Sequence, residues 1–166
     1  LIIPLRGSAS TSSTMNSSSF PWVVSFNDGY SYSSSSSSGE YKVRCVRGAP
    51  FKYSGSFYET EIDGDVVVFD KSSDLRWSKN FVEMAWGDAL EYCEALDYGG
   101  SDDWKLPNIK ELRSLVDTDL FYPASSFPDL VSFPFWSSSS LASSPNKAWS
   151  VDFYSGSSST MKIKTD

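Results

Sequence analysis

The chain has 166 residues, a formal net charge of −7 and a sequence pI near 4.5. This length allows one good hydrophobic core with a substantial appendage, and the acidity argues against nucleic acid because a phosphate backbone requires a concentrated basic face. The absence of His removes the commonest general base and the main zinc ligand, and no run reaches the roughly eighteen apolar residues that cross a bilayer. Composition therefore predicts no enzyme, no cofactor, no metal, no nucleic-acid partner and no membrane insertion.

The first third of the chain repeats a segment found near the end of the sequence. PWVVSFNDG at 21–29 aligns with AWSVDFYSG at 148–156, an offset of 127 residues, and YKVRCVRG from 41 aligns with MKIKTD from 161. We interpret residues 1–48 as the C-terminal half of a preceding repeat and 49–166 as a nearly complete domain. An unpaired half-domain exposes strand edges and apolar faces. Either the chain is a piece of a longer tandem protein, or this half folds against something else, including a neighbouring subunit in a head-to-tail assembly.

The same first third carries the basic cluster Lys42, Arg44 and Arg47. Alternate residues of a strand share a face, so Lys42 and Arg44 would project together and could meet an anionic sugar. Ordinary ion pairing on a very acidic protein is the favoured alternative.

Serine is unusually frequent, in the runs Ser33–Ser38, Ser137–Ser140 and Ser157–Ser159. Such tracts lack apolar mass, so we expect exposed loops or strand edges there. Plain solvated loop is favoured over attachment of O-linked sugar.

A hairpin is expected in the middle of the chain. Asp65–Asp70 reads DVVVFD, a β-branched and aromatic run, and it follows the turn Asp63-Gly64, with YETEI at Tyr58–Ile62 as its partner strand. The aspartates near this turn depart from the spacing of an EF-hand loop, so we predict no calcium site.

A first helix is expected from Glu83 onward. Apolar residues recur every three to four positions and predict a buried stripe along about three turns. Gly99 and Gly100 then supply the stop, because glycine accepts the left-handed conformation. The predicted stripe comprises Ala85, Ala89, Leu90, Cys93 and Leu96.

A second helix should begin at Pro107 and Asn108 and end near Asp117. Asn108 and Glu111 form a capping box in the sequence. Further on, Trp149–Phe153 alternates between apolar and polar residues, which is typical of a strand. Two helices inside a chain of short strands indicate an α+β domain.

Aromatic residues on loops are the candidate ligand contacts. Sugars stack their apolar faces on Trp or Tyr, while neighbouring polar groups bond the hydroxyls. Trp136 beside a serine run, Tyr154 beyond the last strand and Asp152 on that strand's polar face fit this chemistry. For Trp136 a core position is the favoured alternative, and Trp149, Trp104 and Trp77 are expected in the core.

The segment Trp86–Asp117, followed by FWSSSS from Phe135 and AWSVDF from Ala148, resembles the C-terminal domain family of the Legionella collagen-like protein. The resemblance implies a C-type-lectin-like fold with two short helices packed on small antiparallel sheets and long serine-rich loops. It also implies a secreted or cell-surface protein that functions in adhesion, with a glycan, sulfated glycans included, or a cell-surface protein as its partner.

The resemblance further implies a structural disulfide between the first helix and the terminal RCVR strand. Here the helix supplies Cys93, but the strand of the same repeat has Thr165 near the expected position, and Cys45 belongs to the preceding half-repeat. Three outcomes stay open: Cys45 bonds Cys93 in the same chain, Cys45 bonds Cys93 of a neighbour, or both thiols are free.

Together these features predict an extracellular, non-catalytic recognition or adhesion module. The alternative is a structural subunit of a filament or sheath, assembled head to tail through the half-repeat. An oxidase of the same fold would require reactive thiols, and Cys93 on a buried helical stripe is a poor candidate.

Overall fold

The computed structural model describes residues 9–15, 21–25, 28–33, 47 and 55–163. A six-stranded antiparallel sheet has the order β1-β2-β3-β9-β8-β7, and a three-stranded antiparallel sheet has the order β4-β5-β6. The elements are β1 (Ala9–Met15), β2 (Pro21–Ser25), β3 (Ser31–Ser33), β4 (Phe57–Ile62), β5 (Asp65–Asp70), β6 (Leu75–Ser78), α1 (Trp86–Glu94), α2 (Ile109–Arg113), β7 (Pro134–Leu141), β8 (Ser144–Asp152) and β9 (Ser157–Lys162).

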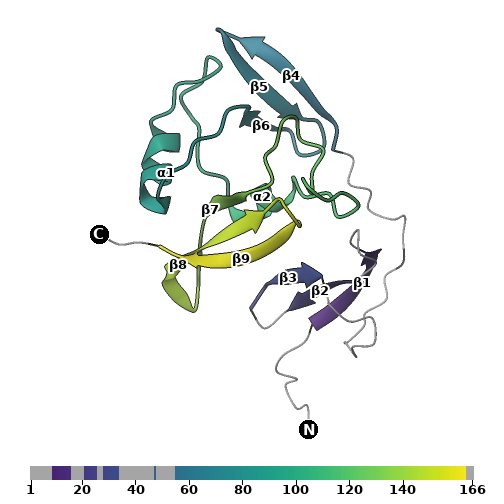
Figure 1. Cartoon of the computed structure of the whole chain (residues 1–166). Coiled ribbons are helices and arrows are strands. Elements are labelled where there is room, and N and C mark those ends of the chain that lie inside the picture. Colours follow the sequence, from purple (N-terminus) through teal and green to yellow (C-terminus); the bar gives the residue numbers. More distant parts are fainter. Residues whose placement is uncertain (1–8, 16–20, 26–27, 34–46, 48–54, 164–166) are drawn as a thin grey trace.

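The arrangement confirms the predicted α+β class. In Figure 1 the β4–β6 sheet lies at the top, β1–β3 lie at the opposite end, and the helices lie with β7–β9 between them. The C-type-lectin-like fold itself stays a prediction.

The predicted hairpin is present, with β4 and β5 paired from Phe57↔Asp70 to Ile62↔Asp65. Asp63 and Gly64 both have positive φ, 52° and 89°. Two central residues with positive φ form the turn whose twist matches that of a two-residue hairpin. The local sequence therefore specified both the turn and the register.

The first helix is shorter than predicted. α1 begins at Trp86 rather than near Glu83 and ends at Glu94, and Ala89 is its one buried residue. Gly99 and Gly100 are not its stop: with φ of 56° and 68° they form the turn of a separate bridge between Tyr98 and Ser101. Of the predicted buried stripe only Ala89 is buried: Ala85 is exposed, and Leu90, Cys93 and Leu96 are half-buried, the last two lining a cleft.

The second helix confirms its capping box. The Asn108 side chain accepts hydrogen bonds from the main-chain N–H groups of Lys110 and Glu111, and the Glu111 side chain accepts one from Asn108 N. α2 ends at Arg113, earlier than Asp117, because the chain continues in tighter turns such as Leu115 N to Leu112 O.

The core lies where α2, β5 and β8 meet. Phe153 and Val151 are fully buried, and Phe127 packs edge-on against Phe57 and Trp77, with ring centroids 5.2 and 6.3 Å away. The buried cluster comprises Val68, Leu112, Leu115, Phe127, Val151 and Phe153. Trp77 packs against this cluster, as expected.

The two later serine runs lie in strands, Ser137–Ser140 in the edge strand β7 and Ser157–Ser159 in β9, so the strand-edge alternative holds for the first of them and neither is an exposed loop. Ser137 in β7 is fully buried and donates a hydrogen bond to Trp149 O at 2.9 Å, and Ser158 in β9 is 4% exposed. A serine hydroxyl is small and finds acceptors in the adjoining ladder, so burial leaves it satisfied. The first run falls outside the described residues beyond Ser33.

The first third of the chain docks on the β9 edge. β3 pairs with β9 at Ser31↔Ser158, and Trp22 and Val23 of β2 are buried. Cover for Trp22 thus comes from the same chain. The division at residues 48 and 49 and the head-to-tail alternative stay predictions.

Candidate functional site

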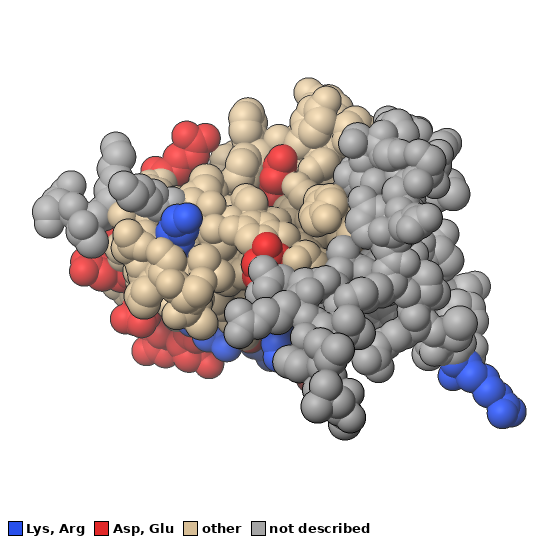
Figure 2. Space-filling view, turned by 90° about the horizontal axis from the view of Figure 1, so that it is seen from below, with Lys and Arg blue, Asp and Glu red and all other residues tan. Residues whose placement is uncertain are grey.

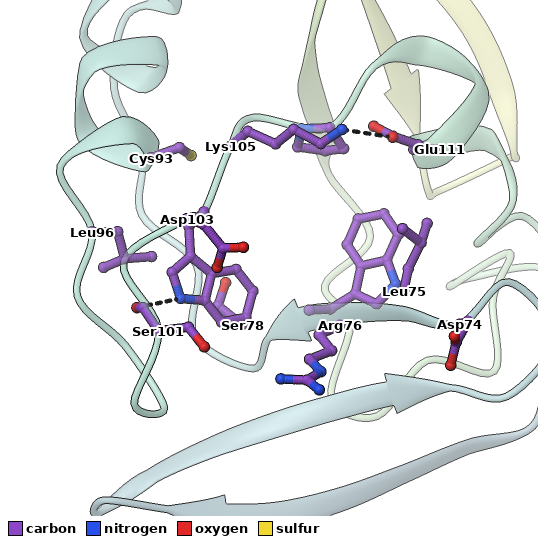
Figure 3. A pocket seen from close by; sticks show the side chains of 13 residues that line it. Asp74, Leu75, Arg76, Ser78, Cys93, Leu96, Ser101, Asp103, Lys105 and Glu111 are labelled. Atoms are coloured by element: carbon purple, nitrogen blue, oxygen red, sulfur yellow. Dashed lines mark hydrogen bonds and ion pairs between the residues drawn. The ribbon is translucent and has the colours of Figure 1, made fainter.

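A cleft of about 470 Å³ lies between β6, α1, the 101–107 loop and the start of α2. Figure 3 shows Cys93 of α1 and Leu96, which follows that helix, on one side, Leu75 of β6 on the other, and the Asp103 carboxylate between them. Its lining residues are Asp74, Leu75, Arg76, Trp77, Ser78, Cys93, Leu96, Ser101, Asp103, Trp104, Lys105, Pro107 and Glu111.

The turn at Gly99-Gly100 positions one wall of this cleft. Tyr98 Oη donates to Val66 O at 2.6 Å, and Gly99 N donates to an Asp65 carboxylate oxygen at 3.0 Å, so the turn is fixed to β5. Trp104 Nε1 in turn donates to the carbonyl oxygens of Tyr98 and Ser101, at 2.9 and 3.0 Å. Because its N–H is satisfied by main-chain acceptors, the Trp104 ring is held in one orientation.

Charges of both signs border the cleft. Lys105 forms an ion pair with Glu111 at 3.0 Å along its upper edge in Figure 3. Arg76 lies over the Phe69 ring, with its guanidinium carbon 5.3 Å from the ring centroid. Asp103 is exposed. Half-buried indoles beside a carboxylate and hydroxyls suit a ligand that has both apolar faces and hydroxyl groups.

Cys93 brings a half-buried thiol to the cleft wall, and it forms no disulfide within the described residues. Burial raises the pKa of this thiol. A raised pKa lowers the fraction of thiolate, which is the nucleophilic form, so Cys93 is suited to packing rather than to oxidase chemistry. Since Cys45 lies outside the described residues, the pairing of these two cysteines stays a prediction.

A separate aromatic cluster lies at the β8–β9 turn and consists of Phe121, Tyr122 and Tyr154. Tyr154 contacts both other rings edge-on, with centroids 4.9 and 5.3 Å away, and the three side chains are 42%, 67% and 47% exposed. Tyr122 N donates to Tyr154 O at 3.3 Å. Tyr122 also has a φ of 59°, a conformation that bulky residues rarely adopt outside functional or tightly constrained sites.

The family model of the Lcl C-terminal domain matches residues 66–166, which include the cleft and the aromatic cluster. The chain belongs to the Lcl C-terminal domain family. No curated protein and no solved structure matches the chain significantly. The Lcl family is one of bacterial collagen-like surface proteins, which indicates an extracellular module. Within the described residues, neither helix has the length and apolarity needed to cross a membrane.

The structure brings together two of the five predicted ligand residues of this chain. Asp152 accepts a hydrogen bond from Tyr154 N at 2.9 Å, so its carboxylate fixes the turn that carries Tyr154. Trp136 is half-buried on β7 and belongs to neither the cleft nor the aromatic cluster. Lys42 and Arg44 lie outside the described residues, and their role stays a prediction.

Sequence reasoning missed most of the cleft. Trp104 was expected in the core, yet it borders the cleft, and Trp149 is half-buried against Tyr30, with ring centroids 5.0 Å apart. Phe121 and Tyr122 did carry a usable signal: two adjacent aromatics directly before a proline, in a stretch with no strand or helix periodicity.

The charge distribution matches the acidic composition. Figure 2 shows acidic side chains gathered along one side of the face seen from below, whereas most of the described surface on that face is uncharged. A strongly polyanionic ligand would meet repulsion at this acidic side.

Proposed function

We propose that this Lcl domain is an extracellular recognition module that binds a glycan in the cleft between β6, α1 and the 101–107 loop. The observation that carries the proposal is the combination, in one cavity of about 470 Å³, of two half-buried tryptophans with an exposed aspartate. Small-ligand sites typically have a volume of about 300–1,000 Å³, so the cavity has room for one or two sugar residues.

Each wall has a role in this proposal. The Trp104 ring, fixed through Tyr98 O and Ser101 O, offers a rigid apolar face for the C–H side of a pyranose. Asp103 accepts hydrogen bonds from sugar hydroxyls, and bonds to a charged acceptor contribute about 1.5–3 kcal/mol each. Leu96 supplies apolar contact from the segment that follows α1.

Binding of a panel of immobilised glycans, followed by calorimetry with the best ligand, tests the proposal. Asp103→Ala should weaken binding about ten- to hundred-fold, the equivalent of a lost charge-assisted hydrogen bond. Asp102→Ala is the matched control, because Asp102 is an adjacent, exposed aspartate that lies outside the cleft. Equal affinities of the two variants would reject the cleft as the glycan site.

The aromatic cluster favours a second candidate function, recognition of a protein surface. Clustered exposed aromatics with polar neighbours are typical of protein interfaces. The two candidates differ in a cell-adherence assay with domain-coated beads. Enzymatic removal of cell-surface glycans should abolish adherence if the cleft mediates it. If the aromatic cluster mediates adherence, adherence should survive this treatment. It should then be lost in the double variant Tyr122→Ala, Tyr154→Ala but kept in Tyr92→Ala, the control at an exposed position of α1.

A further inference from the structure

The β2–β3 and β8–β9 hairpins are two copies of one structure. Gly29 N donates to Ser25 O at 2.8 Å, and Gly156 N donates to Asp152 O at 2.7 Å, at positions separated by the repeat offset of 127 residues. Both glycines have positive φ, 81° and 74°. The sequence repeat is thus also a repeat of backbone geometry.

The two hairpins meet through equivalent residues. Ser31 of β3 lies directly opposite Ser158 of β9, its own counterpart in the repeat, and their hydroxyl oxygens are 3.0 Å apart. Each serine is 4% exposed. When equivalent residues of two antiparallel strands face each other, a local two-fold axis passes between them, and here it passes between these serines.

Side chains cross this axis in both directions. A Cβ on Gly29 would lie 3.6 Å from the outer ring atoms of Trp149, and a Cβ on Gly156 would lie 3.7 Å from Cη2 of Trp22. Trp22 and Trp149 are themselves equivalent, as are the two glycines. The tryptophan of each hairpin therefore packs on the turn of the other, and such reciprocal contacts define an isologous interface.

We propose that the β8–β9 edge is a self-complementary docking surface whose partner is the β8–β9 hairpin of a second copy, and that the β1–β3 segment occupies it within the chain. The second copy would place its own Trp149 where Trp22 now lies, and its own Ser158 opposite Ser158. Because an isologous contact closes on itself, displacement of β3 yields a dimer rather than an open filament.

Two matched substitutions test this docking surface in the full-length chain. Ser31→Asp and Ser158→Asp each place an unpaired carboxylate at the same buried contact and weaken the intrachain pairing alike. Only Ser158→Asp also puts two like charges opposite each other in the proposed dimer. Sedimentation equilibrium should show that Ser31→Asp dimerises at a concentration at least about ten-fold lower than wild type or Ser158→Asp. Equal association of the two variants would overturn the proposal.

A cross-linking measurement covers the case in which Ser158→Asp fails to fold. In a Ser31→Asp background with Cys45 and Cys93 replaced by serine, Ser158→Cys should form an interchain disulfide rapidly, because the two copies of residue 158 face each other across the axis. Ser159→Cys, one position along β9, is the control and should cross-link at least about five-fold more slowly, because one residue along a strand points a side chain to the opposite face. Equal rates at the two positions would contradict the proposed register.

Discussion

Gly99 offers a direct test of how the cleft wall is built. Its φ is 56°, and a Cβ at this position would overlap Cγ2 of Val67, a core residue that is 1% exposed. Gly99→Ala therefore combines left-handed backbone strain, about 1–2 kcal/mol, with overpacking against Val67, about 1–3 kcal/mol. Alanine also restricts the unfolded chain, which returns about 0.4–1 kcal/mol.

Gly64→Ala isolates the overpacking. Gly64 also has a positive φ, 89°, but a Cβ there would meet nothing within 4 Å. Backbone strain and unfolded-state effects are common to both variants, so the difference between them reports the contact with Val67. Urea unfolding followed by tryptophan fluorescence should place the free energy of unfolding of Gly99→Ala about 1–3 kcal/mol below that of Gly64→Ala, with an unchanged m-value.

A double-mutant cycle completes the test. In a Val67→Ala background the clashing methyl is absent, so Gly99→Ala should cost no more than Gly64→Ala does in wild type. Stabilities of Gly99→Ala and Gly64→Ala within about 0.5 kcal/mol of each other would refute the packing of the Gly99 turn on β5. The main-chain acceptors for Trp104 come from this turn, so Gly99→Ala should also weaken glycan binding in the cleft.

Three further predictions concern single groups. Burial tends to raise the pKa of Asp70, but hydrogen bonds from Ser72 and Ser73 outweigh the effect of burial and lower the pKa below its ordinary value of 3.8. The stabilisation is therefore present above about pH 4 and lost as pH falls further. Thermal unfolding of Asp70→Asn should depend less on pH between about 4 and 2, and an unchanged slope would contradict this. Asn108→Ala should cost about 1 kcal/mol in urea unfolding through its lost helix cap, whereas an exposed-site control such as Lys110→Ala should not. Because burial raises the pKa of Cys93, iodoacetamide at pH 8 should alkylate it more slowly in the folded chain than in urea, as mass spectrometry of the Cys93 peptide will show; equal rates would contradict this.

Local sequence signals were sufficient to predict the structure wherever neighbouring residues determine the backbone conformation. Asp63-Gly64 specified a hairpin because a two-residue turn requires positive φ, and Asn108 with Glu111 specified a helix start because their side chains satisfy the first free N–H groups. The repeat of 21–29 at 148–156 could also be recognised from the sequence, and its structural counterpart is the pair of equivalent turns in the β2–β3 and β8–β9 hairpins.

Tertiary contacts decided the features that periodicity could not resolve. An apolar stripe predicts which face of a helix is shielded from water, but it does not predict whether that face packs on the core or lines a cleft. Here Cys93 of α1 and Leu96, just after it, line the cleft. The serine tracts were predicted as exposed loops or strand edges from their lack of apolar mass, yet Ser137 is buried in the edge strand β7, where a partner strand supplies its acceptor. Likewise, the sequence by itself determined that Trp22 and Trp149 are equivalent. Only the tertiary structure shows that these two tryptophans lie on opposite sides of the local two-fold axis between β3 and β9. The pairing of these two strands depends on which strand edges meet in space, and no local sequence pattern encodes that.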